Sequence, residues 1–294
     1  MKTEFRNFAH DDYQSVCQFL IKLNDESRQN INWNWARWEW MFFHPELDIE
    51  SLDTIGLWFD DDEVVGLATY DHYNGEAFFA TLTAYKSLEE QLLEYVIANF
   101  QDKTGLGIAV NDANEAGIAL LEKYNFEIAQ QSEQVLACDL ENADLHYELH
   151  PDFQLHNLQP ENDLYEHHEV LWEGFENEGP LPLDEKTLNV QKRMLTAPHL
   201  DSSLHIVAKN QAGFAAYCGG WYDKTTDYAY IEPLCTKPAY RKLGLGKALV
   251  LETLHRCGLM GAKKAYVISD DSFYKNIGFE EHSHFSFYWY KPQV

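Results

Sequence analysis

The residues with the clearest chemical potential lie between positions 228 and 251, in the stretch YAYIEPLCTKPAYRKLGLGKALVL. An extended apolar run is followed by a turn, by Gly244 and Gly246, and then by a segment with a strong preference for helix. Glycine lets a backbone turn tightly and approach a ligand closely. The first N–H groups of a helix have no partner inside the helix and carry roughly half a positive charge. The segment therefore predicts a diphosphate site, to which Arg241 and Lys242 add positive charge.

Two familiar phosphate motifs do not fit this loop. A P-loop needs GxxxxGK[ST], but Arg241 stands at its first glycine and Ala248 follows Lys247. A dinucleotide fingerprint needs GxGxxG, but Leu249 stands at its third glycine. The loop therefore belongs to another class of phosphate site.

The loop resembles the acetyl-CoA signature [RQ]xxGx[GA] of the GNAT acetyltransferases, through Arg241, Gly244 and Gly246. The preceding segment 236–240, TKPAY, matches the lead-in V-x-P-x-[YF] apart from threonine in place of valine. Downstream, the segment 273–279 matches the terminal [LF]Yx₃GF pattern of the family. The sequence is also similar to two-domain GNAT proteins in which one copy is degenerate, such as mycothiol synthase.

This resemblance implies how acetyl-CoA is held. Backbone N–H groups from Arg241 to Gly246 would bind the pyrophosphate, and the main chain around Cys235 would pair with the pantetheine arm like an added strand. The residues expected to bind the cofactor are Leu234, Cys235, Thr236, Arg241, Lys242, Leu243, Gly244, Leu245, Gly246 and Lys247.

The resemblance also implies two catalytic residues. Tyr274 matches the tyrosine that protonates the leaving sulfur, with a packed core tyrosine as the alternative. Glu232 stands in an apolar strand where some family members carry a general base, and a carboxylate there is costly to bury unless it is used or paired. The stretch VISDDSFY, which ends at this tyrosine, is shorter than in many members, so Ser269, Asp270 or Asp271 is expected to replace the usual asparagine.

The elements that position these residues occur twice. Pro45 recurs as Pro198, 153 positions later, and the same offset carries Gly66 onto Gly219 and Phe126 onto Phe279. The sequence predicts a degenerate domain at 1–140, a polar linker at 141–152 and a catalytic domain at 153–294.

Each copy follows one pattern of strands and helices. A short strand and two helical segments precede two or three strands joined by hairpin signals, such as LHIVAK-NQAG-FAAYCGGWY. A helix follows, at 88–100 in the first copy and 244–257 in the second, and then a strand, a short helix and a last strand. Antiparallel strands followed by strands alternating with helices predict an α/β fold, with a mixed sheet flanked by helices in each domain.

The first copy lacks the predicted site. At the 153-residue offset, Arg241 corresponds to Leu88, Gly244 to Gln91, Gly246 to Leu93, Tyr274 to Leu121 and Glu232 to Phe79. Ser87 is expected to cap the helix at this point, and Glu89 and Glu90 would repel a diphosphate. The first copy is therefore expected to shape the acceptor cleft or to pack against the second copy.

Composition limits the class of protein. The 294 residues suit two domains, and 22 basic against 48 acidic residues give a net charge of −26, which disfavours nucleic acids and anionic membranes as partners. No apolar run reaches the roughly 18 residues of a membrane span. The five cysteines are scattered without a CxxC pair, as in a reducing cytoplasm.

Other features of the sequence have a structural interpretation beside the functional one. The aromatic cluster between Trp33 and Phe43 is more typical of a core than of a ligand platform, and Cys235 of a buried thiol than of a nucleophile. The histidines form no complete metal site, and no metal is expected. The segment 171–180, LWEGFENEGP, could attract a cationic amine through Glu173, Glu176 and Glu178, or could be an ordinary solvated loop.

The sequence thus predicts a cytoplasmic acetyl-CoA-dependent N-acetyltransferase that acts on a primary amine by direct attack on the thioester. The alternative is a non-catalytic acyl-CoA-binding regulatory module. Neither the acceptor, nor the acyl chain, nor the oligomeric state follows from the residues.

Overall fold

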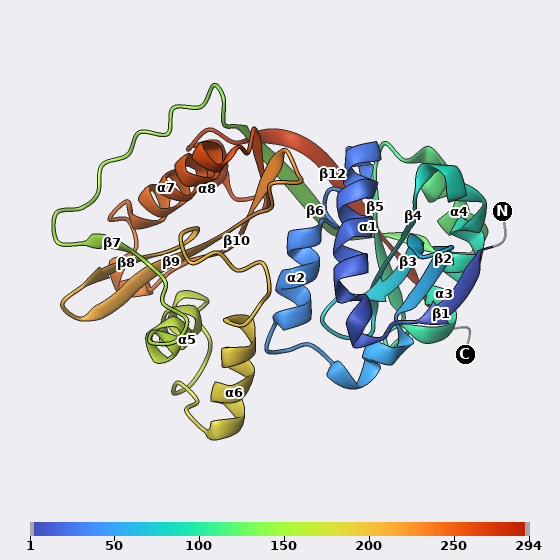
Figure 1. Ribbon diagram of the computed structural model, residues 1–294, viewed down its shortest axis with the longest axis horizontal. Coiled ribbons are helices and arrows are strands. Elements are labelled where there is room, and N and C mark those ends of the chain that lie inside the picture. Colours follow the sequence, from blue (N-terminus) through green and yellow to red (C-terminus); the bar gives the residue numbers. More distant parts are fainter. Residues whose placement is uncertain (1–2, 292–294) are drawn as a thin grey trace.

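One continuous sheet of twelve strands organises the chain, as seen in a computed structural model that describes residues 3–291 (Figure 1). The strand order is β1-β2-β3-β4-β5-β12-β6-β11-β10-β9-β8-β7. The sheet is mixed, because β4 runs parallel to β5 and β10 parallel to β11, whereas the other neighbours are antiparallel. The predicted α/β fold with a mixed sheet is confirmed.

The described part of the first half, from residue 3 onwards, contains six strands and four α-helices. They are β1 (Glu4–Asn7), α1 (Tyr13–Glu26), α2 (Trp35–Phe43), β2 (Gly56–Asp60), β3 (Glu63–Tyr70), β4 (Glu76–Thr81), α3 (Glu89–Asn99), β5 (Leu106–Asn111), α4 (Glu115–Lys123) and β6 (Glu127–Asp139). Short 3-10 helices lie at η1 (His10–Asp12), η2 (Arg28–Asn30), η3 (Ile49–Thr54) and η4 (Thr83–Leu88).

The second half repeats the same order of elements. They are β7 (Gln154–Asn157), α5 (Leu164–Gly174), α6 (Glu185–Met194), β8 (His205–Asn210), β9 (Gly213–Tyr222), β10 (Tyr228–Thr236), the 3-10 helix η5 (Pro238–Tyr240), α7 (Leu245–Met260), β11 (Lys264–Ile268), α8 (Ser272–Lys275) and β12 (Glu280–Tyr290). Residues 141–153 between the halves form neither helix nor strand.

The two halves exchange their last strands. β6 from the first half pairs with β11 of the second half, and β12 from the second half pairs with β5 of the first. β6 and β12 also pair with each other, with Phe285 opposite Glu133 and Ser286 opposite Ser132. In Figure 1 these two long strands join the halves of the molecule. Each half of the sequence therefore contributes its last strand to the part of the sheet that the other half builds.

Helices cover both faces of the sheet. Neighbouring residues of a strand point to opposite faces, and on β9 Tyr217 packs against His167 of α5, whereas an added Cβ on Gly220 would meet Thr253 of α7. α5 and α7 therefore lie on opposite faces of β9. Among residues 3–291, no helix combines the length and apolar character needed to cross a bilayer.

The helix predictions are close to the observed bounds, with one error at a cap. The segments 88–100 and 244–257 become α3 (Glu89–Asn99) and α7 (Leu245–Met260). Ser87 does not cap α3, because the chain already turns as η4 before it, so that Leu88 occupies the cap position.

Candidate functional site

A cleft opens where two parallel strands of the second half separate. β10 and β11 pair only from Tyr228 to Tyr230, but β10 continues to Thr236. The cleft in this gap has a volume of about 720 Å³. It is lined by Gly174, Phe175, Leu234, Cys235, Thr236, Tyr240, Arg241, Lys242, Gly244, Leu245, Gly246, Lys247, Ser269, Asp271, Phe273 and Tyr274.

The start of α7 presents hydrogen-bond donors to this cleft. Gly244 occupies the N-cap position with φ +78°, a left-handed conformation that favours glycine. Within the described part of the chain, no side chain caps this helix, so the N–H groups of its first turn lack a partner of the kind that most helix starts have. A Cβ on Gly246 would lie 3.5 Å from the ring of Phe273. The loop therefore has the free donors and the narrow walls that a diphosphate site needs.

Arg241 fixes the loop to the end of α5. Its guanidinium donates to the Gly174 carbonyl at 3.0 Å and to the Thr236 carbonyl at 3.1 Å, and it pairs with Glu176 at 2.8 Å. Gly174 comes so close to β10 that an added Cβ would lie 2.7 Å from the Cβ of Cys235. The end of α5 thus forms one wall of the cleft.

The acidic segment after α5 is already engaged within the chain. Glu176 pairs with Arg241, and Glu173 lies 3.5 Å from the buried Lys237, whose main partner is Glu169 at 2.7 Å. Two of the three glutamates considered for amine attraction therefore neutralise cations beside the loop, while Glu178 is exposed.

The structure brings most of the predicted cofactor residues together. Nine of the ten line the cleft, and the exception, Leu243, is 37 % exposed and lies outside its wall. Ser269 and Asp271, considered as substitutes for the family's asparagine, also line it, but Asp270 does not. Asp271 caps α8 by accepting from the Phe273 N–H at 2.8 Å.

Tyr274 lies on the wall of the cleft, in the first turn of α8, with only 8 % of its surface exposed. Burial raises the pKa of its hydroxyl well above the usual value, and the negative charges of Glu232 and Asp271 act in the same direction. The phenol therefore stays protonated at neutral pH, as a proton donor must.

Glu232 lies at a break in the β9–β10 ladder rather than in the cleft wall. The register shifts between Ile231 and Leu234, and the Trp221 indole donates to the Glu232 carbonyl at 2.7 Å. The carboxylate oxygen Oε2 is buried and has no hydrogen-bond partner among residues 3–291. Burial raises the pKa of this carboxyl group, against the opposing effect of Arg37.

The first half supplies the charges around Glu232. Arg37 of α2 pairs with Asp71 and with Glu133, both at 3.0 Å, and Asp71 and His72 also affect the Glu232 carboxyl electrostatically. Sequence reasoning did not identify these residues as site residues. For Arg37 alone the sequence contains a signal, because it is a charged residue within the aromatic segment that forms α2.

A smaller cavity of about 140 Å³ adjoins the cleft between α2, α5 and α6. Phe175 lines both cavities. The other lining residues include Trp40, Trp172, His44 and His168. This cavity lies between the two halves, and Phe175 is the lining residue that it shares with the cleft.

The remaining candidate groups take structural places. Trp35 and Trp38 are buried in the core, and burial raises the pKa of Cys235 to about 12, which disfavours a nucleophilic thiolate. Donor atoms of Cys17, Glu39 and His199 lie within 4.8 Å of one another. Glu39 is already bonded to both the backbone N–H and the ring of His199, and burial raises the pKa of Cys17, so this group acts as a contact between the halves.

Comparison with known proteins identifies the second half. Residues 201–281, which contain Glu232, the Gly244 loop and Tyr274, match the family model for the acetyltransferase (GNAT) domain. The second half contains a GNAT domain. No protein of curated function matches the chain by sequence.

Solved structures extend the GNAT likeness to both halves. A tandem GNAT protein from the clavulanic acid biosynthesis pathway superposes with a TM-score of 0.67 at 13 % identity, covering 100 % of both chains. A GCN5-related N-acetyltransferase from Sphaerobacter thermophilus gives 0.62 at 12 % identity, covering 99 % of this chain and 97 % of that one. The N-myristoyltransferase of Saccharomyces cerevisiae gives 0.58 at 10 % identity, covering 97 % and 79 %. At these identities the likeness establishes the tandem GNAT fold.

Proposed function

We propose that the chain is an acetyl-CoA-dependent N-acetyltransferase whose active site lies in the second half. The observation that carries this proposal is the uncapped start of α7 beside the separated strands β10 and β11. The helix start offers donors to a pyrophosphate, and the free edge of β10 from Leu234 to Thr236 offers main-chain groups to the amides of the pantetheine arm. The cavity volume of about 720 Å³ lies within the range of cofactor sites.

Three proton transfers accompany the proposed reaction. Glu232 accepts a proton from the ammonium group of the acceptor, and the freed nitrogen lone pair attacks the thioester carbonyl. The carbon–sulfur bond breaks, and Tyr274 donates its proton to the departing thiolate. The nitrogen of the new amide then gives up its second proton, which restores the Tyr274 hydroxyl. Burial raises the pKa of Tyr274 and keeps its hydroxyl protonated at neutral pH, which supports its role as the proton donor.

The acceptor is proposed to approach through the smaller cavity between the halves. Phe175 links this cavity to the cleft, and Glu46 in its lining supplies a carboxylate that would attract a cationic amine. The first half would thereby act as one wall of the acceptor site. A small primary amine is the substrate class that this charge favours.

Calorimetric titration with acetyl-CoA tests the cofactor assignment. We expect one site per chain, and we expect Gly246→Glu to abolish binding, because the new carboxylate would face the diphosphate. The double variant Gly244→Glu, Gly246→Glu should behave alike. Gly258→Glu, the same substitution near the other end of α7, serves as the matched control and should bind normally. Binding that survives Gly246→Glu would contradict the assignment.

A turnover assay with varied amines separates the enzyme from the regulatory alternative. Release of free thiol from acetyl-CoA in the presence of an amine would support transfer. Tight binding without turnover on any amine would support a non-catalytic acyl-CoA-binding module.

A further inference from the structure

The first half contains a cavity at the position that corresponds to the cofactor cleft. β4 and β5 pair only at Glu76–Gly107 and Ala77–Ile108, although β4 continues to Thr81 and β5 to Asn111. A cavity of about 320 Å³ lies in the gap, lined by the last residues of both strands. The opening between parallel strands has therefore survived in the half that lost the phosphate loop.

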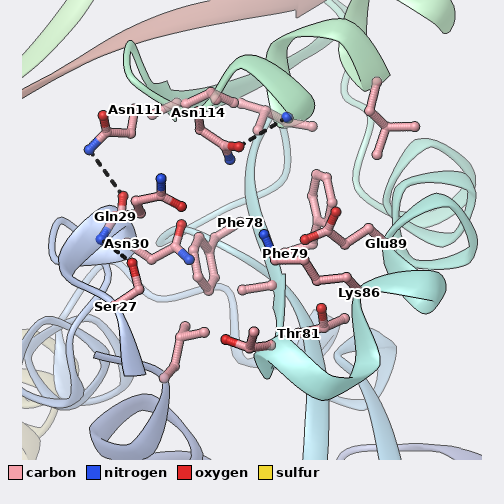
Figure 2. Close-up of a pocket in the computed structure, with 18 of the residues that line it drawn as sticks. Ser27, Gln29, Asn30, Phe78, Phe79, Thr81, Lys86, Glu89, Asn111 and Asn114 are labelled. Atoms are coloured by element: carbon pink, nitrogen blue, oxygen red, sulfur yellow. Dashed lines mark hydrogen bonds between the residues drawn. The ribbon is translucent and has the colours of Figure 1, made fainter. Parts of the chain in front are cut away.

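Amide side chains surround this cavity. Gln29 and Asn30 reach it from η2, and Asn111 and Asn114 from the end of β5 and the start of α4 (Figure 2). Figure 2 shows Asn30 beside the ring of Phe78, and Asn111 donating to the Gln29 carbonyl at 3.2 Å. Such groups can both donate and accept hydrogen bonds, so the cavity suits a ligand that carries amides.

Thr81 adds an unused polar group to the wall. It is only 5 % exposed, and its hydroxyl has no hydrogen-bond partner within residues 3–291. Buried hydroxyl groups nearly always have a partner. A ligand in the cavity would supply the missing one, because Thr81 lines it.

The charge of the site is opposite to that of the cofactor cleft. Glu89 stands in the first turn of α3, where the second half has Lys242 at the 153-residue offset. Glu26 also lines the cavity, with its carboxylate accepting from the Thr83 N–H at 2.8 Å, and Lys86 is the one lining cation within the described residues. A phosphate would be repelled here, whereas a cationic group would be attracted.

We propose that this first-half cavity binds a small molecule with an extended amide chain and a cationic end. The free strand edges and the amide side chains bind the chain, Thr81 contributes a hydroxyl, and Glu89 faces the cation. The proposal does not depend on acetyl transfer in the second half, because the ligand carries no phosphate and touches none of the cleft residues.

The probe is N-acetyl-lysine N-methylamide, which has two amides and one ammonium group. It is titrated by calorimetry and ligand-observed NMR into the full chain in the presence of excess coenzyme A. We expect Thr81→Val to weaken binding about fivefold, the loss of one neutral hydrogen bond. We expect Glu89→Gln to weaken it about threefold, in keeping with a partly exposed ion pair. Ser87→Ala, at an exposed hydroxyl outside the cavity wall, is the control and should bind normally.

Two comparisons decide the outcome. The uncharged N-acetyl-norleucine N-methylamide should bind more weakly and should not respond to Glu89→Gln. Thr81→Val should keep or raise the melting temperature, because it removes an unpartnered hydroxyl; a clear fall would assign Thr81 to the core instead. The proposal is overturned if the probe fails to bind at millimolar concentration, or if its binding is lost with Glu232→Gln, which would place it in the acceptor site. A chain that binds the probe but not acetyl-CoA would leave this site intact and defeat only the transfer proposal.

Discussion

At the scale of single residues, Tyr274 offers the most direct test of the proposed chemistry. Tyr274→Phe removes the proton donor but keeps the buried ring that lines the cleft. We expect kcat to fall about 100-fold, the lower end of the range for general acid catalysis, with little change in KM for acetyl-CoA. Steady-state kinetics measures both, with Tyr222→Phe outside the cleft as the control. An unchanged kcat would return Tyr274 to the role of a core residue.

Glu232 should control the acid side of the pH–rate profile. A base works in its ionised form, and burial raises the pKa of this carboxyl group. The value of kcat/KM should therefore rise with pH through this raised pKa, at a higher pH than for an exposed glutamate. In Glu232→Gln the rate should fall and this rise should disappear. If the same rise persists in the variant, another group is the base.

The cofactor loop and the surroundings of Glu232 differ in how far the sequence predicts them. Loop residues such as Gly244 are predictable because the helix start, the glycines and the strand lie within a short stretch of chain. The neighbours of Glu232 are not, because Arg37 comes from α2 and is held by Glu133 of the exchanged strand β6. No local pattern encodes such a contact.

At the scale of elements, the close approach of α5 to β10 should depend on Gly174. An added methyl group would lie 2.7 Å from the Cβ and 2.8 Å from the sulfur of Cys235. We expect Gly174→Ala to lower the free energy of unfolding by about 1–3 kcal/mol through overpacking, and to weaken acetyl-CoA binding because this wall moves. Chemical denaturation and calorimetry measure the two effects.

Gly258→Ala is the matched control for this substitution. Gly258 lies inside α7, where the nearest contact of an added Cβ is 3.9 Å away, and alanine should stabilise that helix by about 0.5–1 kcal/mol. Equal effects of the two substitutions would show that α5 can shift without cost.

The contact between α2 and the segment before β8 should make stability depend on pH. The hydrogen bond to Glu39 raises the pKa of His199, and Glu39 is fully buried. A histidine whose pKa is higher in the folded state stabilises that state below its unfolded pKa, near 6.5. This stabilisation is lost as the pH rises through the raised, folded-state value.

His199→Ala should therefore lower the free energy of unfolding more at pH 6 than at pH 9. At pH 6 the loss should be about 3 kcal/mol, because the substitution leaves the buried carboxylate of Glu39 without its partner. Tyr13, Cys17 and Asp223 also face this pair, but they cannot supply the lost positive charge. Urea denaturation at the two pH values measures the difference, and an equal cost at both would contradict a charged pair.

At the scale of the whole molecule, the internal repeat was predictable and the strand exchange was not. The 153-residue offset relates the halves because it compares residue types. β6 and β12, however, each run antiparallel to a fifth strand of the same kind, whether β5 or β11. Because both pairings would bury the same faces, the residues alone do not reveal which half each strand completes.

The exchange makes a strong prediction for the chain cut within the predicted linker. Fragment 141–294 retains the phosphate loop and Tyr274 but lacks β6, so β11 would lose its antiparallel neighbour and β12 both of its own. Unpaired strand edges of this length promote aggregation. We expect fragments 1–140 and 141–294 to aggregate or to form mixed oligomers when expressed separately. Expressed together, they should form a one-to-one complex.

Restored acetyl-CoA binding would then indicate correct pairing of the strands, because the complex rebuilds both the sheet and the charges of Arg37 and Asp71 that act on Glu232. Size-exclusion chromatography, circular dichroism and calorimetry distinguish the outcomes. A monomeric, folded fragment 141–294 that binds acetyl-CoA as tightly as the full chain would mean that β12 can return to its own half. In that case the exchanged sheet would be one of two accessible pairings, and the first half would be needed only to build the acceptor wall.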